Sequence, residues 1–465
     1  AIVEVLERNT RKLVGRFKGQ GGFGYMVSEN QRITQDIQII PNDALDLKYR
    51  DGQLVVAELV MAPTKRTKPT ARVVEVLGDH MAPGMEIKVA IHNYDIPDEW
   101  RDGVRQEVSE FGADVDEAAE QNRVDLRGLP LVTIDGEDAK DFDDAVYCER
   151  KRSGGWRLWV AIADVSWYVQ PDTQLDNEAH QRGNSVYFPE FVVPMLPEQL
   201  SNGLCSLNPQ VDRLAMVCEM TISASGKCSG YKFYEAVISS HARLTYNKVG
   251  AMLQEPDSVS GVALRQEYAA LVPHLEDLYD LYHALRKARD VRGAIDFDTI
   301  ETRIIFSEAR KIEQIVPVTR NDAHKIIEEC MLCANVASAR LLQKLDYPAL
   351  YRVHDGPKEA KQEALRAYLG PLGLSLGGGD KPTPTDYQRL TESLEGRADK
   401  HVIQVMMLRS MSQAVYSPDN KGHFGLHYPA YTHFTSPIRR YPDLLVHRTI
   451  RALIHSGQAS NHLLR

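Results

Sequence analysis

The first ninety residues alternate short apolar runs with turn residues and show little helical periodicity. Alternation with a period of two, bounded by Gly, Pro, Asn or Asp, is typical of β-strands. The pattern predicts five strands, which read LVGRF, FGYMV, QDIQIIP, QLVVAELVMAP and ARVVEVLG. Five short strands in so small a region predict a barrel of the OB type.

The pattern changes twice further along the chain. Residues 95–128 are acidic and polar and lack a strong apolar face, which predicts a linker with a helix or two. From Leu129 onward, LPLVTID and WRLWVAIADVS read as buried strands, and residues 264–290 and 322–345 read as long helices. The predicted fold class is α+β, a five-stranded barrel followed by a mixed α+β domain. The expected domains are residues 1–88, a linker with a helix at residues 89–128, and residues 129–465.

The composition is that of an ordinary globular protein. The chain has 465 residues, of which 43% are apolar and 26% charged, so more than one domain is expected. No stretch approaches the roughly 20 apolar residues of a membrane helix, and the N-terminus lacks a charged start followed by an apolar block. These features indicate a cytoplasmic protein without membrane partners.

Charge and cysteine content exclude little. The net charge of −9 argues weakly against nucleic-acid binding, but residues 1–80 carry twelve Lys and Arg against ten Asp and Glu. The six cysteines are scattered through a chain too long to need disulfides, so we expect them to be reduced. Cys330 and Cys333 form a single C-x-x-C without further zinc ligands at a suitable spacing, which favours core residues.

Aromatic and basic residues of the predicted barrel suggest RNA binding. Phe17 and Phe23 lie beside glycines on adjacent strands, where exposed rings would stack on bases, and Lys65 and Arg66 would contact phosphates. In the alternative interpretation, the two phenylalanines are core residues and the basic cluster is a solvated loop. The pattern alone favours neither.

An acidic cluster is the most informative feature of the chain. Six acids occupy the ten positions of residues 135–144. Two carboxylates about 4 Å apart repel by roughly 4 kcal/mol at an effective dielectric constant near 20, so their convergence calls for cations. Asp135 at a strand end and the turn with Asp141, Asp143 and Asp144 would suit one or two Mg²⁺ or Mn²⁺ ions. A solvated acidic loop remains the alternative.

Two other binding motifs do not fit the sequence. A calcium loop that starts at Asp135 would place Lys140 where glycine is required and Val146 where a bidentate Glu belongs. The glycines of residues 377–379 lack the spacing of a phosphate-binding loop, so no nucleotide cofactor is expected.

Longer motifs identify a family. The chain resembles the ribonuclease II/ribonuclease R family in a series of blocks that follow the family order over residues 125–455. These blocks are TIDGEDAKDFDDAVY, LWVAIADVSWYV, SVYFPEFVVPMLPEQLSNGLCSLNP, GAIDFD, HKIIEECMLCAN and HFTSPIRRYPDLLVHR. The resemblance implies an RNB catalytic domain, preceded at residues 5–78 by a domain similar to the second cold-shock domain of the family.

The same resemblance implies an activity and a partial chain. The expected protein is a metal-dependent exoribonuclease that hydrolyses single-stranded RNA, including structured RNA with a 3′ overhang, from the 3′ end to 5′-nucleoside monophosphates. The sequence shows none of the family's upstream helix-turn-helix and first cold-shock domains, nor its downstream S1 domain and lysine-rich tail. Its last residues fall inside the expected catalytic domain, which indicates a truncated chain.

The resemblance assigns roles to the acids. Asp135, Asp141, Asp143 and Asp144 occupy the positions of the catalytic aspartates of the family, with Asp135 and Asp144 as the principal metal ligands. Asp141 completes the cluster, and Asp143 is expected to be essential for the chemistry. Glu137 and Asp138, the other acids of the loop, are expected to be exposed neighbours.

Further residues match the RNA-contacting positions of the family. Tyr187 and Phe297 would stack on the two faces of the 3′-terminal base, and Glu328 would lie near the bound end. Arg439 matches the catalytic arginine, and Arg440 beside it is the second choice for a phosphate ligand. The alternatives are ordinary aromatic packing for the two rings and a surface acid for Glu328.

Two other functions compete with an exoribonuclease. A non-catalytic RNA-binding module on the same fold should have lost part of the acidic set or Arg439, and both are intact here. A DNA exonuclease would share the metal chemistry and differ in contacts to the 2′-hydroxyl. The family resemblance favours single-stranded RNA as the substrate and Mg²⁺, or Mn²⁺, as the cofactor.

Overall fold

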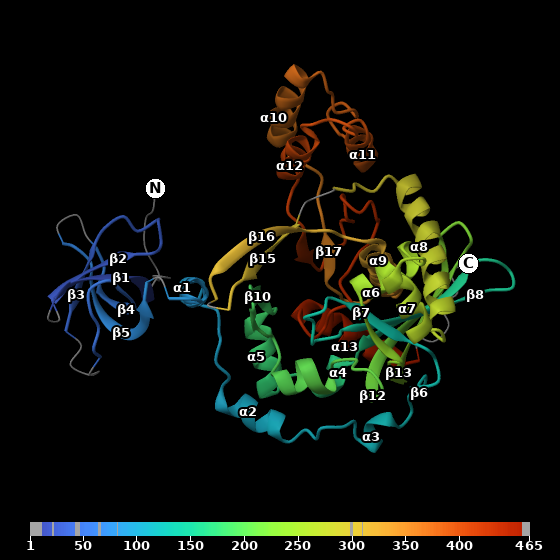
Figure 1. The fold of residues 1–465 in the computed structure, drawn as a ribbon, viewed down its shortest axis with the longest axis horizontal. Helices are drawn as coiled ribbons and strands as arrows, with labels where there is room; N and C mark the ends of the chain where they lie inside the picture. The colour runs from blue at the N-terminus through green and yellow to red at the C-terminus, as the bar shows by residue number, and fades with distance from the viewer. Residues whose placement is uncertain are drawn as a thin grey trace. The chain divides into compact units, whose positions relative to one another are not determined.

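The computed structural model describes residues 12–20, 23–41, 47–63, 67–80, 82–297, 301–308 and 310–457. It divides into two compact units (Figure 1). The first unit comprises Ala1–Trp100, Tyr187–Val193 and Thr302–Pro317, and the second comprises Arg101–Val186, Pro194–Glu301 and Val318–Arg465. Both units therefore draw on separate stretches of the chain.

The first unit contains a closed five-stranded barrel of order β1-β2-β3-β5-β4, which confirms the predicted barrel. Strands β3 and β5 pair in parallel, and the other neighbours pair antiparallel. The strands are β1 (Lys12–Gln20), β2 (Phe23–Ser28), β3 (Ile37–Ile40), β4 (Gln53–Met61) and β5 (Thr70–Asp79). Helix α1 (Met85–Asn93) follows the barrel and contacts β1 and β5.

The glycines beside the aromatic residues make room inside the barrel. Phe17 is 1% exposed and packs in the barrel core with Met26. A Cβ at Gly24 would lie 2.9 Å from the Phe17 ring and 2.2 Å from a backbone carbonyl of β1, so no larger residue fits there. The prediction that the Phe17 ring stacks on bases is therefore wrong, because this side chain is buried in the barrel core.

The second unit is built on a seven-stranded mixed sheet of order β14-β7-β8-β9-β12-β13-β6. The pairs β14-β7 and β13-β6 are parallel, and the others are antiparallel. Its strands are β6 (Val124–Asp125), β7 (Val132–Asp135), β8 (Asp144–Arg150), β9 (Trp156–Ala163), β12 (Asp212–Ile222), β13 (Cys228–Ser239) and β14 (Ala242–Thr245). The predicted strands LPLVTID and WRLWVAIADVS correspond to β7 and β9.

Alternate residues of this sheet form a large core with three helices. On β9 the core side chains are Leu158, Val160 and Ile162. They are two residues apart, as expected for side chains on one face of a strand. Helices α6 (Tyr246–Gln254), α8 (Val272–Arg292) and α9 (Asp322–Lys344) contact these strands (Figure 1). Helix α9 agrees with its prediction, and Asn321 caps its N-terminus.

One predicted helix is two helices. Residues 264–290 fall on α7 (Val259–Glu267) and α8 (Val272–Arg292), which a turn separates. Pro273 lies in the first turn of α8, where its missing N–H costs no hydrogen bond and its ring prevents a continuous helix. The prediction of an unbroken helix is therefore wrong at this point.

The remaining elements are shorter. The structure confirms the fold class, a barrel followed by a mixed α+β domain. In the described residues, three two-stranded sheets pair β10 (Val186–Phe188) with β11 (Phe191–Val193), β15 (Glu301–Phe306) with β16 (Ile312–Val318), and β17 (Tyr351–Val353) with β18 (Val415–Ser417). The other helices are α2 (Asp102–Ser109), α3 (Glu117–Glu120), α4 (Val165–Tyr168), α5 (Gln174–Arg182), η1 (Gln199–Leu204), α10 (Glu359–Leu369), η2 (Gly370–Leu372), α11 (Pro384–Glu392), α12 (Lys400–Ser410) and α13 (Tyr441–His455).

The cysteines behave as predicted. All six are free, Cys330 is buried in the core of the second unit, and Cys333 packs against that core. Among the helices of the described residues, none is both long enough and apolar enough to cross a membrane.

Candidate active site

The acidic cluster lies in the loop between two strands of the large sheet. Strand β7 ends at Asp135 and β8 begins at Asp144. The Ser206 hydroxyl fixes the loop between them, because it donates to the Lys140 carbonyl at 2.8 Å and accepts the Phe142 N–H at 3.0 Å. The acids are therefore carried on a loop whose backbone is held from inside the fold.

Arg243 supports the outer part of the same loop. Its guanidinium donates to the carbonyls of Glu137 and Ala139 at 2.8 and 3.0 Å, and lies 5.0 Å from the centre of the Phe142 ring. Glu137 and Asp138 are exposed, as predicted.

Asp143 is the most enclosed acid of the loop. Its side chain is 5% exposed, and its carboxylate accepts the N–H of Ile438 at 2.9 Å. The other carboxylate oxygen lies 3.6 Å from Nε of Arg439. Burial raises the pKa of Asp143 well above its usual range, and the positive charge of Arg439 opposes that shift. The site thus joins two segments that are almost 300 residues apart in the sequence.

The other aspartates share this electrostatic environment. Burial raises the pKa of Asp144 to about 7, and the charge of Asp135 adds to the shift. Burial also raises the pKa of Asp135, to which the charge of Asp141 contributes. The charge of Asp141 acts in the same direction on Asp143. The pKa values of Asp135, Asp143 and Asp144 are therefore each raised in part by the charge of another aspartate of the loop, as expected for carboxylates gathered around a cation site.

The donor set fits a divalent cation in its chemistry. Within the residues that the structure describes, no group of three or more His, Cys, Asp or Glu side chains converges tightly enough to hold a metal ion. The observation that favours a cation is the charge balance, because the positive charge of Arg439 opposes but does not cancel the rise in the pKa of the buried carboxylates Asp135, Asp143 and Asp144. Carboxylate oxygens are the ligands that Mg²⁺ and Mn²⁺ prefer.

Arg439 is positioned by the turn that precedes α13. Its Nη2 donates to Oγ of Ser436 at 3.1 Å, and its backbone carbonyl accepts the N–H of Ser185 at 3.0 Å. Ser436 is itself buried. The guanidinium remains half exposed, so it faces both the aspartates and the solvent.

Arg440 serves the fold instead of facing the aspartates. Its guanidinium donates to both carboxylate oxygens of Asp443 at 2.9 and 2.7 Å, and Asp443 also accepts the N–H of Ser436 at 2.8 Å. Asp443 is fully buried. The expectation that Arg440 is a second phosphate ligand is not supported by these contacts, because its donors already hold a buried carboxylate.

Arg440→Ala should therefore destabilise the protein. Removal of one partner of a buried ion pair leaves an uncompensated charge and typically costs about 3–5 kcal/mol. Urea unfolding of the variant measures the loss in free energy. The double variant Arg440→Met/Asp443→Asn is the control and should recover most of the stability, because it removes both charges and the amide oxygen still accepts the Ser436 N–H. A loss below about 1 kcal/mol in Arg440→Ala, the range of exposed ion pairs, would contradict this role.

Sequence reasoning missed Tyr246. Its hydroxyl lowers the pKa of the Asp135 carboxyl, and its ring stacks on His324 at a centroid distance of 3.9 Å. Tyr246 directly follows β14, whose last residue, Thr245, lies opposite Asp135 in the parallel pair β14-β7. The pairing of β14 with β7 would have indicated that Tyr246 lies near Asp135, but the local sequence does not reveal which strands pair.

Glu328 belongs to an ion-pair network on α9. Its two carboxylate oxygens lie 2.8 Å from Arg289 and 2.7 Å from Arg320. Burial favours a higher pKa for Glu328, but the hydrogen bonds and charge of Arg289 and Arg320 lower it overall. Glu328 is therefore more than a solvated surface acid. The neighbouring Glu329 is buried and pairs with the same Arg289.

The two predicted base-stacking residues lie in different units. Tyr187 is 55% exposed on β10. Phe297 is partly buried and packs against the hydrophobic cluster of Ile295, Leu365 and Tyr387. Each ring therefore has a described place in the fold, and their joint action on a base remains a prediction.

The barrel candidates are only partly described. Phe23 contributes its backbone to β2, and its side chain lies outside the described structure. Lys65 and Arg66 lie outside the described residues. Among the described side chains of β2, Tyr25 is aromatic and exposed, and it lies opposite Lys18 of β1. The two side chains give the barrel an aromatic and a basic group on neighbouring strands.

The fold and the site define a class of protein. The chain belongs to the RNB domain family, which residues 123–456 match, and residues 25–101 match the cold shock domain family. It is 59% identical to ribonuclease R of Vibrio cholerae over 460 residues, which cover 99% of this chain and 55% of that protein. It is 55% identical to ribonuclease R of Escherichia coli over 457 residues, with coverages of 98% and 55%. The chain thus spans about half the length of these curated relatives.

Solved structures agree with this assignment. Mycoplasma genitalium RNase R in complex with double-stranded RNA superposes with a TM-score of 0.90 at 29% identity, covering 99% of this chain and 80% of that chain. Yeast Ssd1, described as a pseudonuclease, matches with a TM-score of 0.74 at 19% identity, covering 99% and 57%. The second likeness shows the fold alone.

Proposed function

We propose that this chain carries the catalytic part of a hydrolytic exoribonuclease that degrades single-stranded RNA from its 3′ end to 5′-nucleoside monophosphates. The observation that carries the proposal is the buried carboxylate of Asp143 beside Arg439, close to Asp135 and Asp144, in a chain 59% identical to a ribonuclease R. A non-catalytic module would not need to keep buried acids whose ionisation is unfavourable.

Asp135 and Asp144, with Asp141 and Asp143, would hold Mg²⁺ or Mn²⁺. When bound, such a cation supplies a nucleophile from water and offsets charge on the scissile phosphate. The charge of Arg439 and the Ile438 N–H favour the ionised form of Asp143 against its burial, and Tyr246 lowers the pKa of Asp135. Arg439 offers two parallel donors to the non-bridging phosphate oxygens. Tyr187 and Phe297 would stack on the terminal base, and Glu328 would lie near it.

The direct test uses RNA labelled at its 5′ end, incubated with Mg²⁺ beside the matching DNA. The expected result is a ladder that shortens steadily for RNA, release of 5′-monophosphates, and no shortening of DNA. A circular RNA of the same sequence is the control and should stay intact. Internal cuts in the circle, or equal degradation of DNA, would reject the proposal.

The metal proposal predicts a pH-dependent stability. Because burial raises the pKa of Asp144 to about 7, this group stabilises the metal-free fold at low pH, and the contribution is lost as the pH rises through 7. Mg²⁺ at about 100 times its Kd should restore about 2.7 kcal/mol at pH 8 and less at pH 5. Thermal unfolding in EDTA and in Mg²⁺ measures both. In Asp144→Asn both responses should shrink, and unchanged responses would contradict the assignment.

The barrel is proposed to bind RNA through the outer faces of β1 and β2. Tyr25 is 44% exposed, and Val27, two residues away on the same face, is 43% exposed. Because base stacking on an aromatic ring contributes about 1–3 kcal/mol, Tyr25→Ala should weaken binding of long RNA by about tenfold or more. Val27→Ala is the matched control and should change the RNA dissociation constant little. If both substitutions weakened RNA binding equally, Tyr25 would not be a base-stacking residue.

A further inference from the structure

Arg289 of α8 is the centre of an ion-pair network in the second unit, and its side chain is 7% exposed. Its Nη1 lies 2.8 Å from a carboxylate oxygen of Glu328 and 2.8 Å from one of Glu329, both on α9. Its Nη2 lies 3.5 Å from Oδ1 of Asp296, in the segment that follows α8. Burial alone would lower the pKa of Arg289, but its carboxylate partners raise it overall. Arg289 thus stays charged and joins three parts of the fold.

Asp296 connects this network to a predicted base-stacking residue, because it directly precedes Phe297. Its Oδ2 lies 2.6 Å from Nη1 of Arg286, which is close to Arg289 on α8. Burial favours a higher pKa for Asp296, but the charges of Arg289 and Arg286 lower it overall. The carboxylate is therefore ionised and paired with two arginines, although its side chain is 46% exposed.

The segment between α8 and Phe297 folds back on the helix. Helix α8 ends before Gly293, whose φ of 79° lies in the left-handed region that favours glycine. The N–H of Ile295 then donates to the Gly425 carbonyl at 3.0 Å. The ion pairs of Asp296 add a link from this segment to α8 and, through Arg289, to α9.

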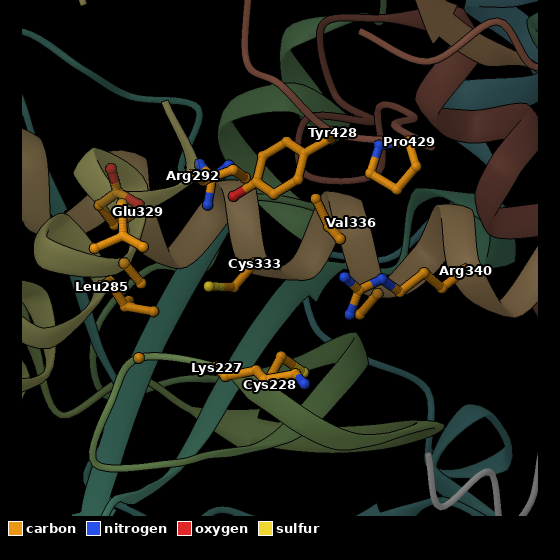
Figure 2. A pocket seen from close by; sticks show the side chains of 14 residues that line it. Lys227, Cys228, Leu285, Arg292, Glu329, Cys333, Val336, Arg340, Tyr428 and Pro429 are labelled. Carbon is orange, nitrogen blue, oxygen red and sulfur yellow. The ribbon is translucent and has the colours of Figure 1, made fainter. Parts of the chain in front are cut away.

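The two glutamates that share Arg289 differ in exposure. The Glu329 side chain is 5% exposed and, with Leu285 of α8, lines a cavity of about 290 Å³ (Figure 2). The Glu328 side chain is 33% exposed. Glu329 therefore anchors Arg289 inside the fold, while Glu328 keeps a surface that a ligand can reach.

We propose that Arg289 is a positioning residue for the 3′ end of the RNA, because it holds Glu328 and, through Asp296, the Phe297 segment in one arrangement. This inference rests on the proposed function, in which Phe297 stacks on the terminal base and Glu328 lies near it. Arg289 is buried and acts through these residues without touching RNA. Contacts that are ordered before binding cost less entropy when the ligand arrives.

Asp296→Asn tests this link, because its side chain is half exposed and Arg289 keeps both glutamates. Binding of a short RNA with 2-aminopurine as its 3′-terminal base is measured in EDTA. The dissociation constant should rise by about three- to tenfold, a part of the stacking contribution of one base. Quenching of the 2-aminopurine fluorescence at saturation should also fall. Loss of an acid strengthens RNA binding by electrostatics alone, so the sign of the effect identifies positioning.

Asp290→Asn is the matched control. It removes a similarly exposed acid that lies 3.4 Å from Arg286, but on α8 and not beside Phe297. It should leave the dissociation constant and the quenching unchanged. Arg289→Lys is the second variant and should resemble Asp296→Asn, because one ammonium keeps the buried charge but cannot hold three carboxylates as a guanidinium does.

Phe297→Ala completes a double-mutant cycle. If the network acts through Phe297, Asp296→Asn should weaken binding little further in the Phe297→Ala background. A full additional loss there, an unchanged or tighter dissociation constant in Asp296→Asn, or an equal loss in Asp290→Asn would overturn the inference. Degradation of RNA by the wild type in Mg²⁺ judges the proposed function separately. An inactive wild type rejects both, whereas an active wild type with unaltered binding in Asp296→Asn rejects only the positioning role.

Discussion

Arg439→Ala should lower the single-turnover rate of RNA cleavage by on the order of 10²–10³, while RNA affinity stays within a few fold. Negative charge gathers on the non-bridging phosphate oxygens during in-line attack, and a fixed guanidinium stabilises it. Ser436 and the backbone bond to Ser185 hold Arg439 in place before substrate arrives. The side chain thus contributes mainly in the transition state.

Two variants make this measurement specific. Arg439→Lys should rescue poorly, because an ammonium keeps the charge without the two parallel donors. Arg440→Ala is unsuitable as a control, since it leaves Asp443 buried without a partner. The exposed Arg409→Ala is better and should retain the full rate. A large loss of affinity with a normal saturated rate would reassign Arg439 to simple phosphate anchoring.

Asp143→Asn should slow cleavage by on the order of 10³ and leave the fold intact. The amide oxygen still accepts the Ile438 N–H, so the change removes one charge and little structure. Single-turnover rates and RNA dissociation constants separate the two effects, and binding should persist. Because a neutral amide costs less to bury than a carboxylate, the metal-free variant should unfold at a slightly higher temperature.

The matched control for this substitution is Asp138→Asn, an exposed acid of the same loop. It should cleave RNA at nearly the wild-type rate, because its carboxylate is solvated and lies outside the buried group. If Asp143→Asn kept full activity, the chemistry would have to be assigned to the other aspartates of the loop.

Local patterns predicted most of the fold. Alternation of apolar residues depends on neighbours in sequence, so the five barrel strands and strands β7 and β9 were found. The acids were found for the same reason, because all four lie within ten residues. The break between α7 and α8 was missed, although Pro273 could have indicated it.

Long-range pairing could not be predicted. Phe17 looked like an exposed ring because the space that Gly24 leaves for it lies on another strand. Arg440 looked like a phosphate ligand although Asp443 is only three residues away, because the burial of Asp443 depends on distant parts of the fold and cannot be read from the local sequence. Tyr246 was missed because only the pairing of β14 with β7 brings it near Asp135. The two units were missed because each is built from stretches that are distant in the sequence.

The hydrogen bond between Asp143 and the Ile438 N–H joins residues 295 positions apart. Contacts of such separation carry a large loop-closure entropy and form late in folding. During synthesis the acids leave the ribosome long before Arg439, while the barrel, whose strands pair within residues 12–79, can fold first. A nascent chain would then hold Asp143 apart from Arg439 until the segment that carries Arg439 has been synthesised.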